Sequence, residues 1–336
     1  MMTKFVKSNA DLPKTLNSDA KQIARAKTLA EAHLGVKAKK AKGPRVQGFF
    51  SRTMKVTMDN GEEAIIQFRV EPLDVASFHQ ARDVLGPVVP NIKRLQDAEL
   101  DRDGIATYFM TCMPGKTWLE SNLWDKWDPK MNVEATKSLG RILSQGYVLG
   151  GSEAVVDSEI KGKLEQLLKS KNNDVQRFRA DIQRLLSSID KLKYLPLWVS
   201  HADLNYLNIL VEDSGQVSGI VDWELSKNLP FGVGLSRVHD LAGKYRNRMF
   251  YMPKEFEEAE RGFWEELFGG IPTDIKRTLL NHLREIEMAV HVGTLLDTLD
   301  QGETLNQAAL NSLPLLLTYR IPALRGDGAP FPTANT

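Results

Sequence analysis

The sequence is poor in several features that would each point to a particular class of protein. It has one cysteine, Cys112, so no disulfide can form within the chain. No stretch approaches the roughly 20 apolar residues that a membrane-spanning helix needs, and no apolar run of the signal-peptide type stands near residue 1. Lys and Arg number 44 against 43 acidic residues, a net charge of +1. These features predict a soluble, cytoplasmic protein with no nucleic-acid or membrane partner.

The 336 residues, 42% of them hydrophobic, suffice for a sizeable core. Residues 1–45 combine a helical pattern with a basic run, which predicts a helical extension and a basic joint. The basic run is interpreted as a solvated surface or flexible joint, with a partner-binding segment as the less favoured alternative. Residues 46–115 favour strands, residues 116–324 are mainly helical, and residues 325–336 predict a flexible tail. The helix candidates beyond residue 116 lie near 132 to 149, 157 to 169, 173 to 191, 254 to 267, 273 to 299 and 303 to 318.

A β-hairpin is predicted within residues 48–69, because the turn residues Asp59, Asn60 and Gly61 separate two runs with strand composition. A further strand is predicted at residues 105–113, where Pro114 and Gly115 end it. The expected fold class is therefore α+β, with an antiparallel sheet in the first third of the chain.

The most informative segment begins at His201, which follows a short apolar stretch. Asp203 comes two residues later, and Asn208 comes five residues after Asp203 at the start of a short predicted strand. A turn at 213–215 then leads to an alternating stretch that ends at Asp222. Amide and carboxylate oxygens are ligands that Mg²⁺ prefers, so Asn208 and Asp222 are the predicted metal ligands.

In order and spacing these residues correspond to the catalytic loop and metal-binding Asp of protein kinases. Together with Asp222-Trp223-Glu224 they resemble the aminoglycoside phosphotransferase and choline kinase family, with weaker support from residues 48–51, 64–69 and 113–115. The run 224–234 further resembles a fungal branch of that family whose members mostly lack a known substrate. The resemblance implies a two-lobed, protein-kinase-like fold, with a nucleotide-binding N-lobe at 46–115 and a helical C-lobe at 116–324.

The resemblance also implies an activity, namely an ATP- and Mg²⁺-dependent phosphotransferase, or kinase, acting on a hydroxyl of a small molecule. In that activity Asp203 orients the attacking hydroxyl, while Asn208 and Asp222 hold Mg²⁺ against the nucleotide phosphates. His201 is expected to brace the loop rather than to react.

The chain departs from the kinase pattern in its third strand. Gln67 stands where the spacing predicts a lysine, and Arg69 lies two residues on, on the same strand face. Arg69 could replace the lysine, since a guanidinium grips phosphate through two hydrogen bonds. The nucleotide-binding residues implied by the resemblance are Gly48, Ser51, Gln67, Arg69, Thr111 and Met113.

Two other functions stay open at this stage. The first is a degenerate kinase-like binding protein without turnover, favoured by Gln67 and by the lack of a glutamate in the predicted helix 73–85. The second is a metal-dependent hydrolase with His201, Asp203 and Asp222 as ligands.

The substrate is not identified by the sequence. Six glutamates lie between Glu255 and Glu266, with apolar residues at helical spacing. One interpretation is an amphipathic helix with a solvated acidic face. The other is that some of these carboxylates attract a cationic substrate, as the resemblance implies.

Overall fold

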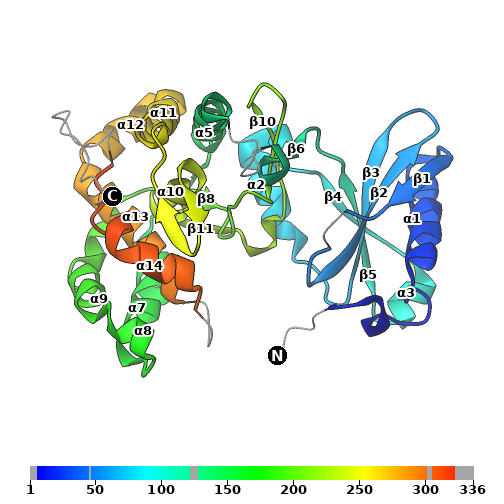
Figure 1. Ribbon diagram of the computed structural model, residues 1–336, viewed down its shortest axis with the longest axis horizontal. Helices are drawn as coiled ribbons and strands as arrows, with labels where there is room; N and C mark the ends of the chain where they lie inside the picture. Colours follow the sequence, from blue (N-terminus) through cyan, green and yellow to red (C-terminus); the bar gives the residue numbers. More distant parts are fainter. Residues whose placement is uncertain (1–5, 45–46, 122–127, 301–304, 322–336) are drawn as a thin grey trace. The chain divides into compact units, whose positions relative to one another are not determined.

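The computed structural model describes residues 6–44, 47–121, 128–300 and 305–321, and the chain divides into two compact units, Met1–Pro114 and Gly115–Thr336 (Figure 1). The predicted boundary at 45/46 and the predicted tail at 325–336 lie outside the described residues. Among the described helices, none combines the length and apolar character needed to span a membrane.

Unit 1 is built on a five-stranded antiparallel sheet in the order β1-β2-β3-β5-β4. Its elements are η1 (Asn9–Asp11), α1 (Asp19–Leu34), β1 (Ala38–Lys42), β2 (Ser51–Met58), β3 (Glu63–Arg69), α2 (Val75–Leu85), η2 (Gly86–Val88), β4 (Ile92–Leu95), α3 (Ala98–Arg102) and β5 (Ala106–Thr111). The predicted hairpin is present as β2 and β3, and Gly61 supplies the positive φ of 87° that its turn requires. The antiparallel sheet in the first third of the chain is thereby confirmed.

Helix α1 packs against this sheet (Figure 1). It begins after the Ser18 cap, whose side chain accepts a hydrogen bond from Lys21 N, and ends at Gly35 in the left-handed conformation. Its buried side chains share one apolar core with β2 and β3, which includes Ala26, Leu29, Ala30, Met54, Val56, Ile66 and Phe68. The helix is therefore an integral layer of unit 1.

The basic run was expected to be a solvated surface or a flexible joint. Lys39, Lys40 and Lys42 are exposed, as a solvated surface requires, but the segment is not a joint. Residues 38–42 form β1, which pairs with β2 at the edge of the sheet. Lysine side chains on an edge strand keep it from pairing with other chains, so a charged segment can still be a strand. Ala38, the first residue of β1, is buried and anchors the strand to the core.

Unit 2 is mainly helical, as expected, with short strands inserted. Its elements up to the second sheet are β6 (Lys116–Thr117), α4 (Trp118–Ser121), α5 (Pro129–Leu143), β7 (Tyr147–Val148), α6 (Glu153–Val155), η3 (Val156–Ile160), α7 (Lys161–Lys169), α8 (Asn173–Gln176), α9 (Arg179–Leu186), η4 (Ile189–Tyr194), β8 (Leu197–Ser200), β9 (Ile209–Val211) and β10 (Val217–Ile220). The remainder are η5 (Trp223–Leu225), β11 (Lys227–Pro230), η6 (Val233–Leu235), α10 (Val238–Ala242), β12 (Lys244–Arg246), β13 (Met249–Tyr251), α11 (Phe256–Gly270), α12 (Thr273–Leu280), α13 (Leu283–Leu299) and α14 (Gln307–Leu316).

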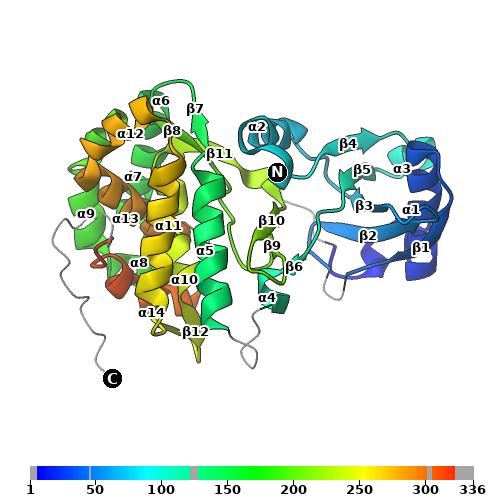
Figure 2. The same ribbon diagram turned by 90° about the horizontal axis from the view of Figure 1, so that it is seen from above.

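Helices α5 and α11 lie side by side and pack closely against each other (Figure 2). Gly140 on α5 makes the contact possible, because a Cβ at that position would lie 2.3 Å from the main-chain oxygen of Phe263 on α11. Apolar side chains of α11, among them Phe263 and Leu267, are fully buried. The predicted amphipathic helix at 254 to 267 is therefore present, and its apolar face is a core element.

Three predicted helices are shorter than expected or interrupted. The candidate at 173 to 191 is divided into α8, α9 and the start of η4. The candidate at 132 to 149 ends at Leu143, and residues 147–148 form β7 instead. The candidate at 273 to 299 is interrupted at Asn281 and His282, which separate α12 from α13. Part of the candidate at 303 to 318 falls outside the described residues, and α14 covers the rest of it.

Candidate functional site

Three short strands of unit 2 carry the predicted site residues. His201 directly follows β8, Asn208 directly precedes β9, and Asp222 lies just beyond β10. Strands β9 and β10 pair in antiparallel fashion, and Val221 N–H donates to the main-chain oxygen of Asn208 at 2.8 Å. The pairing therefore places Asn208 next to the residue before Asp222, as the turn at 213–215 predicts.

Asp203 and Asn208 are in direct contact. The Asn208 amide nitrogen donates to the main-chain oxygen of Asp203 at 2.9 Å and to its Oδ2 at 3.3 Å. Asn205 donates to Asp203 Oδ1 at 3.0 Å. Because both acceptors of the Asn208 amide are oxygens, its Nδ2 faces Asp203 and its Oδ1 points elsewhere. Asn208 Oδ1 accepts no hydrogen bond from the residues that the structure describes.

His201 stabilises the loop that carries Asp203. Its buried ring donates through Nε2 to the main-chain oxygen of Val221 at 2.6 Å and meets the Trp223 indole edge-to-face at 4.6 Å. Burial lowers the pKa of His201, although the Val221 carbonyl and the charges of Asp222 and Asp203 act in the opposite direction. The ring is therefore neutral, with its proton on Nε2.

Asp222 sits at an unusual backbone position. Its φ of 69° and ψ of 51° lie in the left-handed region, which few residues other than glycine adopt. Asp and Asn tolerate this conformation better than other residues. The side chain is exposed, while the following Trp223 is fully buried and donates to the main-chain oxygen of Ile220 at 2.7 Å. The anchored indole thus fixes the backbone turn at Asp222.

The donor set fits a hard divalent cation. An amide oxygen from Asn208 and a carboxylate from Asp222 are typical of Mg²⁺ sites that are completed by water and phosphate oxygens. No group of three or more His, Cys, Asp or Glu residues suited to a metal occurs in the described part of the chain. His201, Asp203 and Asp222 form no such group, so the described residues do not supply the three-ligand centre that the hydrolase alternative requires.

A further residue of the loop, Tyr206, was missed by the sequence analysis. Its hydroxyl donates to the main-chain oxygen of Asp240 at 2.5 Å, and the main-chain oxygen of Gly243 lies 2.8 Å from the same hydroxyl. Its ring meets the Trp118 indole edge-to-face. Burial, together with the charge of Asp240, raises the pKa of Tyr206, so its hydroxyl stays protonated. Tyr206 therefore anchors the loop to α10. No short motif marks this role, since the partners are main-chain atoms far along the sequence.

In unit 1, the residues predicted to contact phosphates share one face of the β2–β3 hairpin. Ser51 pairs with Arg69 and Thr53 with Gln67 across the two strands, and paired residues lie on the same face. Gln67 Nε2 donates to Ser51 Oγ at 3.0 Å and to Thr53 Oγ1 at 3.3 Å, while Arg69 Nη1 lies 3.5 Å from Gln67 Oε1. Gln67 therefore links Ser51 to Arg69 rather than standing alone.

The other residues predicted to contact the nucleotide are more scattered within unit 1. Gly48 is exposed ahead of β2, and its main-chain oxygen accepts from Arg52 at 3.2 Å. The Thr111 N–H donates to Asn91 O at 3.0 Å and belongs to the sheet, whereas the Met113 N–H has no partner among the described residues. Of the two predicted adenine contacts, Met113 thus keeps an available donor.

An antiparallel-sheet unit followed by a helical unit, with Asp203, Asn208 and Asp222 at successive strand ends, defines a protein-kinase-like phosphotransferase fold. The sequence model of the phosphotransferase enzyme family (APH) matches residues 45–240. The match covers more than half of the chain, and the chain belongs to this family.

Solved structures of related fold agree with this assignment. The macrolide 2'-phosphotransferase MphH of Brachybacterium faecium is 17% identical, with a TM-score of 0.52 over 87% of this chain and 98% of that chain. The Plasmodium vivax ethanolamine kinase is 13% identical, with a TM-score of 0.51 over 90% and 88% of the two chains. Aminoglycoside phosphotransferase APH(4)-Ia is 12% identical, with a TM-score of 0.57 over 88% and 97%. None of the curated proteins compared with the chain matches its sequence. The expected protein-kinase-like α+β fold is confirmed.

Proposed function

We propose that the protein transfers the terminal phosphate of ATP to a hydroxyl of a small molecule, with Mg²⁺ as the metal. The observation that carries this proposal is the contact between Asp203 and Asn208. The Asn208 amide nitrogen donates to Asp203 and so holds the Asp203 carboxylate on the loop. The same contact leaves Asn208 Oδ1, the proposed metal ligand, facing away from Asp203. Residues 46–115 would form the nucleotide-binding lobe and residues 116–324 the lobe that carries this loop.

The chemistry assigned to these residues is mainly positioning. Asp203 accepts the hydrogen bond of the attacking hydroxyl and orients its oxygen toward the phosphorus, as the equivalent Asp does in kinases. Asn208 and Asp222 would hold Mg²⁺, which lowers the charge on the transferred phosphate when it is bound. His201 and Tyr206 keep the loop in one geometry, and small displacements of such groups slow a reaction strongly.

Nucleotide use is supported by proteins of the same fold. Variants of APH(4)-Ia were solved in ternary complexes with hygromycin B, one with ADP and one with AMP-PNP, at TM-scores of 0.51 and 0.53 to this chain. In this chain the residues proposed to contact the nucleotide are Gly48, Ser51, Gln67, Arg69, Thr111 through its carbonyl, and Met113. The cytoplasm is the proposed location, and it suits a free cysteine such as Cys112.

The glutamates of α11 give little support to a cationic substrate. Glu260 is buried against His239, Glu257 pairs with Arg261, and Glu266 pairs with Arg141. These pairs make the first interpretation, an ordinary amphipathic helix, the better one for this segment.

The proposal is tested by measuring phosphate transfer from ATP to an acceptor. The purified protein is incubated with ATP, Mg²⁺ and pooled hydroxylated small molecules, and ADP release is measured. We expect acceptor-dependent ADP that is lost in Asp203→Asn and retained in Asp213→Asn, a control on the exposed turn between β9 and β10. If the intact protein binds magnesium-ATP but no pool yields ADP, the non-catalytic binding protein replaces this proposal.

A further inference from the structure

The segment that leads into β2, residues 47–51, is held through its main chain. Phe49, in the middle of this segment, is 64% exposed, so its side chain does not anchor the segment in the core. The side chain of Gln47 accepts from the Thr53 N–H at 2.9 Å and donates to the Thr53 main-chain oxygen at 3.0 Å. These two bonds imitate those of a paired strand and fix the beginning of the segment on β2.

Further contacts hold the main-chain oxygens of the segment. Arg52 Nη1 donates to the oxygens of Gly48 at 3.2 Å and Ser51 at 3.0 Å. The Val6 N–H donates to the oxygen of Phe49 at 2.6 Å. Val6 is buried in the apolar core that α1 shares with β2 and β3, and Arg52 lies on the same face of β2 as core residues 54 and 56. The oxygens of Gly48 and Phe49 therefore point toward the α1 side of the sheet.

The direction of the Gly48 oxygen also determines where the next N–H points. The C=O and N–H groups of one trans peptide unit point in opposite directions, and the described chain has no cis peptide bond. The Phe49 N–H therefore points away from α1, toward the side of the sheet that carries Ser51, Gln67 and Arg69.

Two donors on that side are available to a ligand. The Phe49 N–H donates to no atom of the residues that the structure describes. Ser51 Oγ accepts from Gln67 at 3.0 Å, and its own proton has no acceptor within the described ranges. Main-chain N–H groups and hydroxyls of this kind bind phosphate oxygens.

Arg52 is itself held by the segment that precedes α1. Its Nε donates to Asn9 Oδ1 at 3.5 Å, and the same oxygen accepts from Gln22 Nε2 at 2.9 Å. The Asn9 amide nitrogen donates to Asp19 at 2.8 Å. Asn9 therefore ties Arg52 to α1. Val6 and Asn9 lie outside residues 45–240, which the family model matches, so the family assignment gives them no role.

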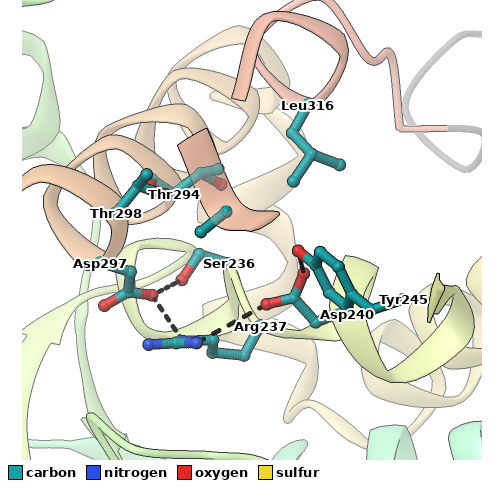
Figure 3. A pocket seen from close by; sticks show the side chains of 9 residues that line it. Ser236, Arg237, Asp240, Tyr245, Thr294, Asp297, Thr298 and Leu316 are labelled. Atoms are coloured by element: carbon teal, nitrogen blue, oxygen red, sulfur yellow. Dashed lines mark hydrogen bonds and ion pairs between the residues drawn. The ribbon is translucent and has the colours of Figure 1, made fainter. Parts of the chain in front are cut away.

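A buried arginine of unit 2, Arg237, is arranged differently (Figure 3). It lies beside a small hollow, 3.3 Å from Asp297 and 3.7 Å from Asp240. Its charge is compensated by these carboxylates, and it joins α13 to α10, the helix on which Tyr206 is anchored. Arg52 makes no ion pair with the residues that the structure describes, since its acceptors are uncharged oxygens.

The burial of Arg52 is therefore unfavourable in itself. A guanidinium loses hydration when it is buried, and no carboxylate in contact with Arg52 offsets that loss. Burial lowers the pKa of Arg52, although the charges of Asp11 and Asp19 act in the opposite direction. The free energy of burial is offset by the hydrogen bonds to Asn9, Gly48 and Ser51, which hold one conformation of the segment.

We propose that Arg52 positions residues 48–51 to bind the phosphates of ATP, and that Asn9 supports Arg52 in this role. Arg52 is a positioning residue, because it acts through the main chain of the segment, which presents the Phe49 N–H and the Ser51 hydroxyl. The inference rests on the proposed ATP-dependent function and extends its nucleotide site to the N-terminal segment.

The test compares ATP with adenosine, which lacks the phosphates. Calorimetry gives the Kd of magnesium-ATP and of adenosine for the full-length protein, Arg52→Met, Arg52→Lys and Asn9→Ala, and urea unfolding checks that each variant is folded. The controls are Asn17→Ala, whose exposed side chain contacts only Lys21, and Arg102→Met, whose exposed side chain contacts only the Ala98 oxygen.

The ATP Kd should rise roughly tenfold in Arg52→Met and roughly threefold in Asn9→Ala, while the adenosine Kd stays within about twofold. Arg52→Lys keeps the charge and a donor for the two oxygens, so its ATP Kd should lie between those of the intact protein and Arg52→Met. Asn9→Ala keeps the charge of Arg52, so its effect separates positioning from simple attraction between Arg52 and the phosphates. Both controls should match the intact protein.

Two results would overturn the inference. One is an unchanged ATP Kd in folded Asn9→Ala and folded Arg52→Lys, which decide the matter even where Arg52→Met does not fold. The other is an equal loss of ATP and adenosine binding, which would show general support of unit 1 instead of positioning for phosphate. Absence of magnesium-ATP binding by the intact protein would instead overturn the proposed function, so the two failures are told apart.

Discussion

His201 and Val221 are joined by a 2.6 Å hydrogen bond from the imidazole Nε2 to the main-chain oxygen. Val221 immediately precedes Asp222, and its own N–H donates to Asn208. Asp203 lies two residues after His201, so one buried ring connects the loop of Asp203 to the turn of Asp222. The histidine of this motif therefore has a structural role, because its imidazole Nε2 links the loop that carries Asp203 to the turn that carries Asp222.

The pH dependence of stability should report on this ring. Burial lowers the pKa of His201 below its usual value, so the unfolded chain takes up a proton that the folded protein resists. The stabilising effect of the neutral ring is complete above about pH 6.5 and is lost as pH falls below it, at up to about 1.4 kcal/mol per pH unit. Urea unfolding between pH 7.5 and 5 should therefore show a shallower slope for His201→Gln than for the intact protein. Parallel curves would show that His201 does not titrate differently in the two states.

Tyr206→Phe should weaken the anchor of the loop while retaining the contact with Trp118. The variant removes the hydroxyl that donates to the main-chain oxygen of Asp240, which costs about 1–3 kcal/mol. Chemical denaturation measures this loss, and ADP release should fall with it because the loop that carries Asp203 loses its support. Tyr194→Phe, at an exposed tyrosine, is the matched control and should change neither quantity.

Glu260→Gln should be one of the most destabilising conservative changes in unit 2. Glu260 and His239 are both fully buried, 2.6 Å apart, and Trp264 donates to the second carboxylate oxygen. Burial lowers the pKa of His239, but the Glu260 charge outweighs it and the pKa is raised. Removing one partner of a buried pair costs about 3 kcal/mol or more.

The Glu260→Gln effect should also depend on pH in a defined direction. The stabilisation by the charged pair is present below about pH 6.5 and is lost as pH rises through the raised pKa of His239. Thermal or urea unfolding at pH 6 and pH 9 should therefore give a larger difference at pH 6. Glu265→Gln, an exposed position on the same helix, should cost almost nothing. Equal small effects of both changes would contradict a charged pair.

Arg69→Met should weaken ATP binding if this arginine replaces the expected lysine. A hydrogen bond to a charged group contributes about 1.5–3 kcal/mol, which corresponds to a roughly 10- to 100-fold rise in Kd. Calorimetric titration with magnesium-ATP measures this. Arg102→Met is the control, because Arg102 is exposed on α3 and its Nε donates to the main-chain oxygen of Ala98 in the same helix. An unchanged Kd for Arg69→Met would remove Arg69 from the proposed phosphate contacts.

The sequence predicted those features that local chemistry determines. Gly61 and Gly215 mark turns that need positive φ, and so the hairpins of β2–β3 and β9–β10 could be located. The spacing from Asp203 to Asn208 likewise depends on one short loop. Strand β1 was missed because its lysines look like a solvated run, and its strand character comes from pairing with β2.

Long-range contacts account for the parts of the site that the sequence did not reveal. The pairing of Arg237 with Asp297 joins α13 to a segment far earlier in the chain, and the anchor of Tyr206 consists of main-chain oxygens with no residue signature. The glutamates of α11 illustrate the converse. Their composition permitted a substrate-binding face, but Glu260 faces the core and is matched by His239, which only the packing of α10 on α11 determines.

The most direct measurement of the central claim is a calorimetric titration of the protein with ATP, with and without Mg²⁺, beside Asp222→Asn and Asp213→Asn. Asn keeps the left-handed backbone position accessible at residue 222 but removes the charge. We predict magnesium-dependent binding by the intact protein and by Asp213→Asn, with at least a tenfold loss in Asp222→Asn. Equal binding by all three proteins, or no binding by the intact protein, would contradict the proposed nucleotide and metal site.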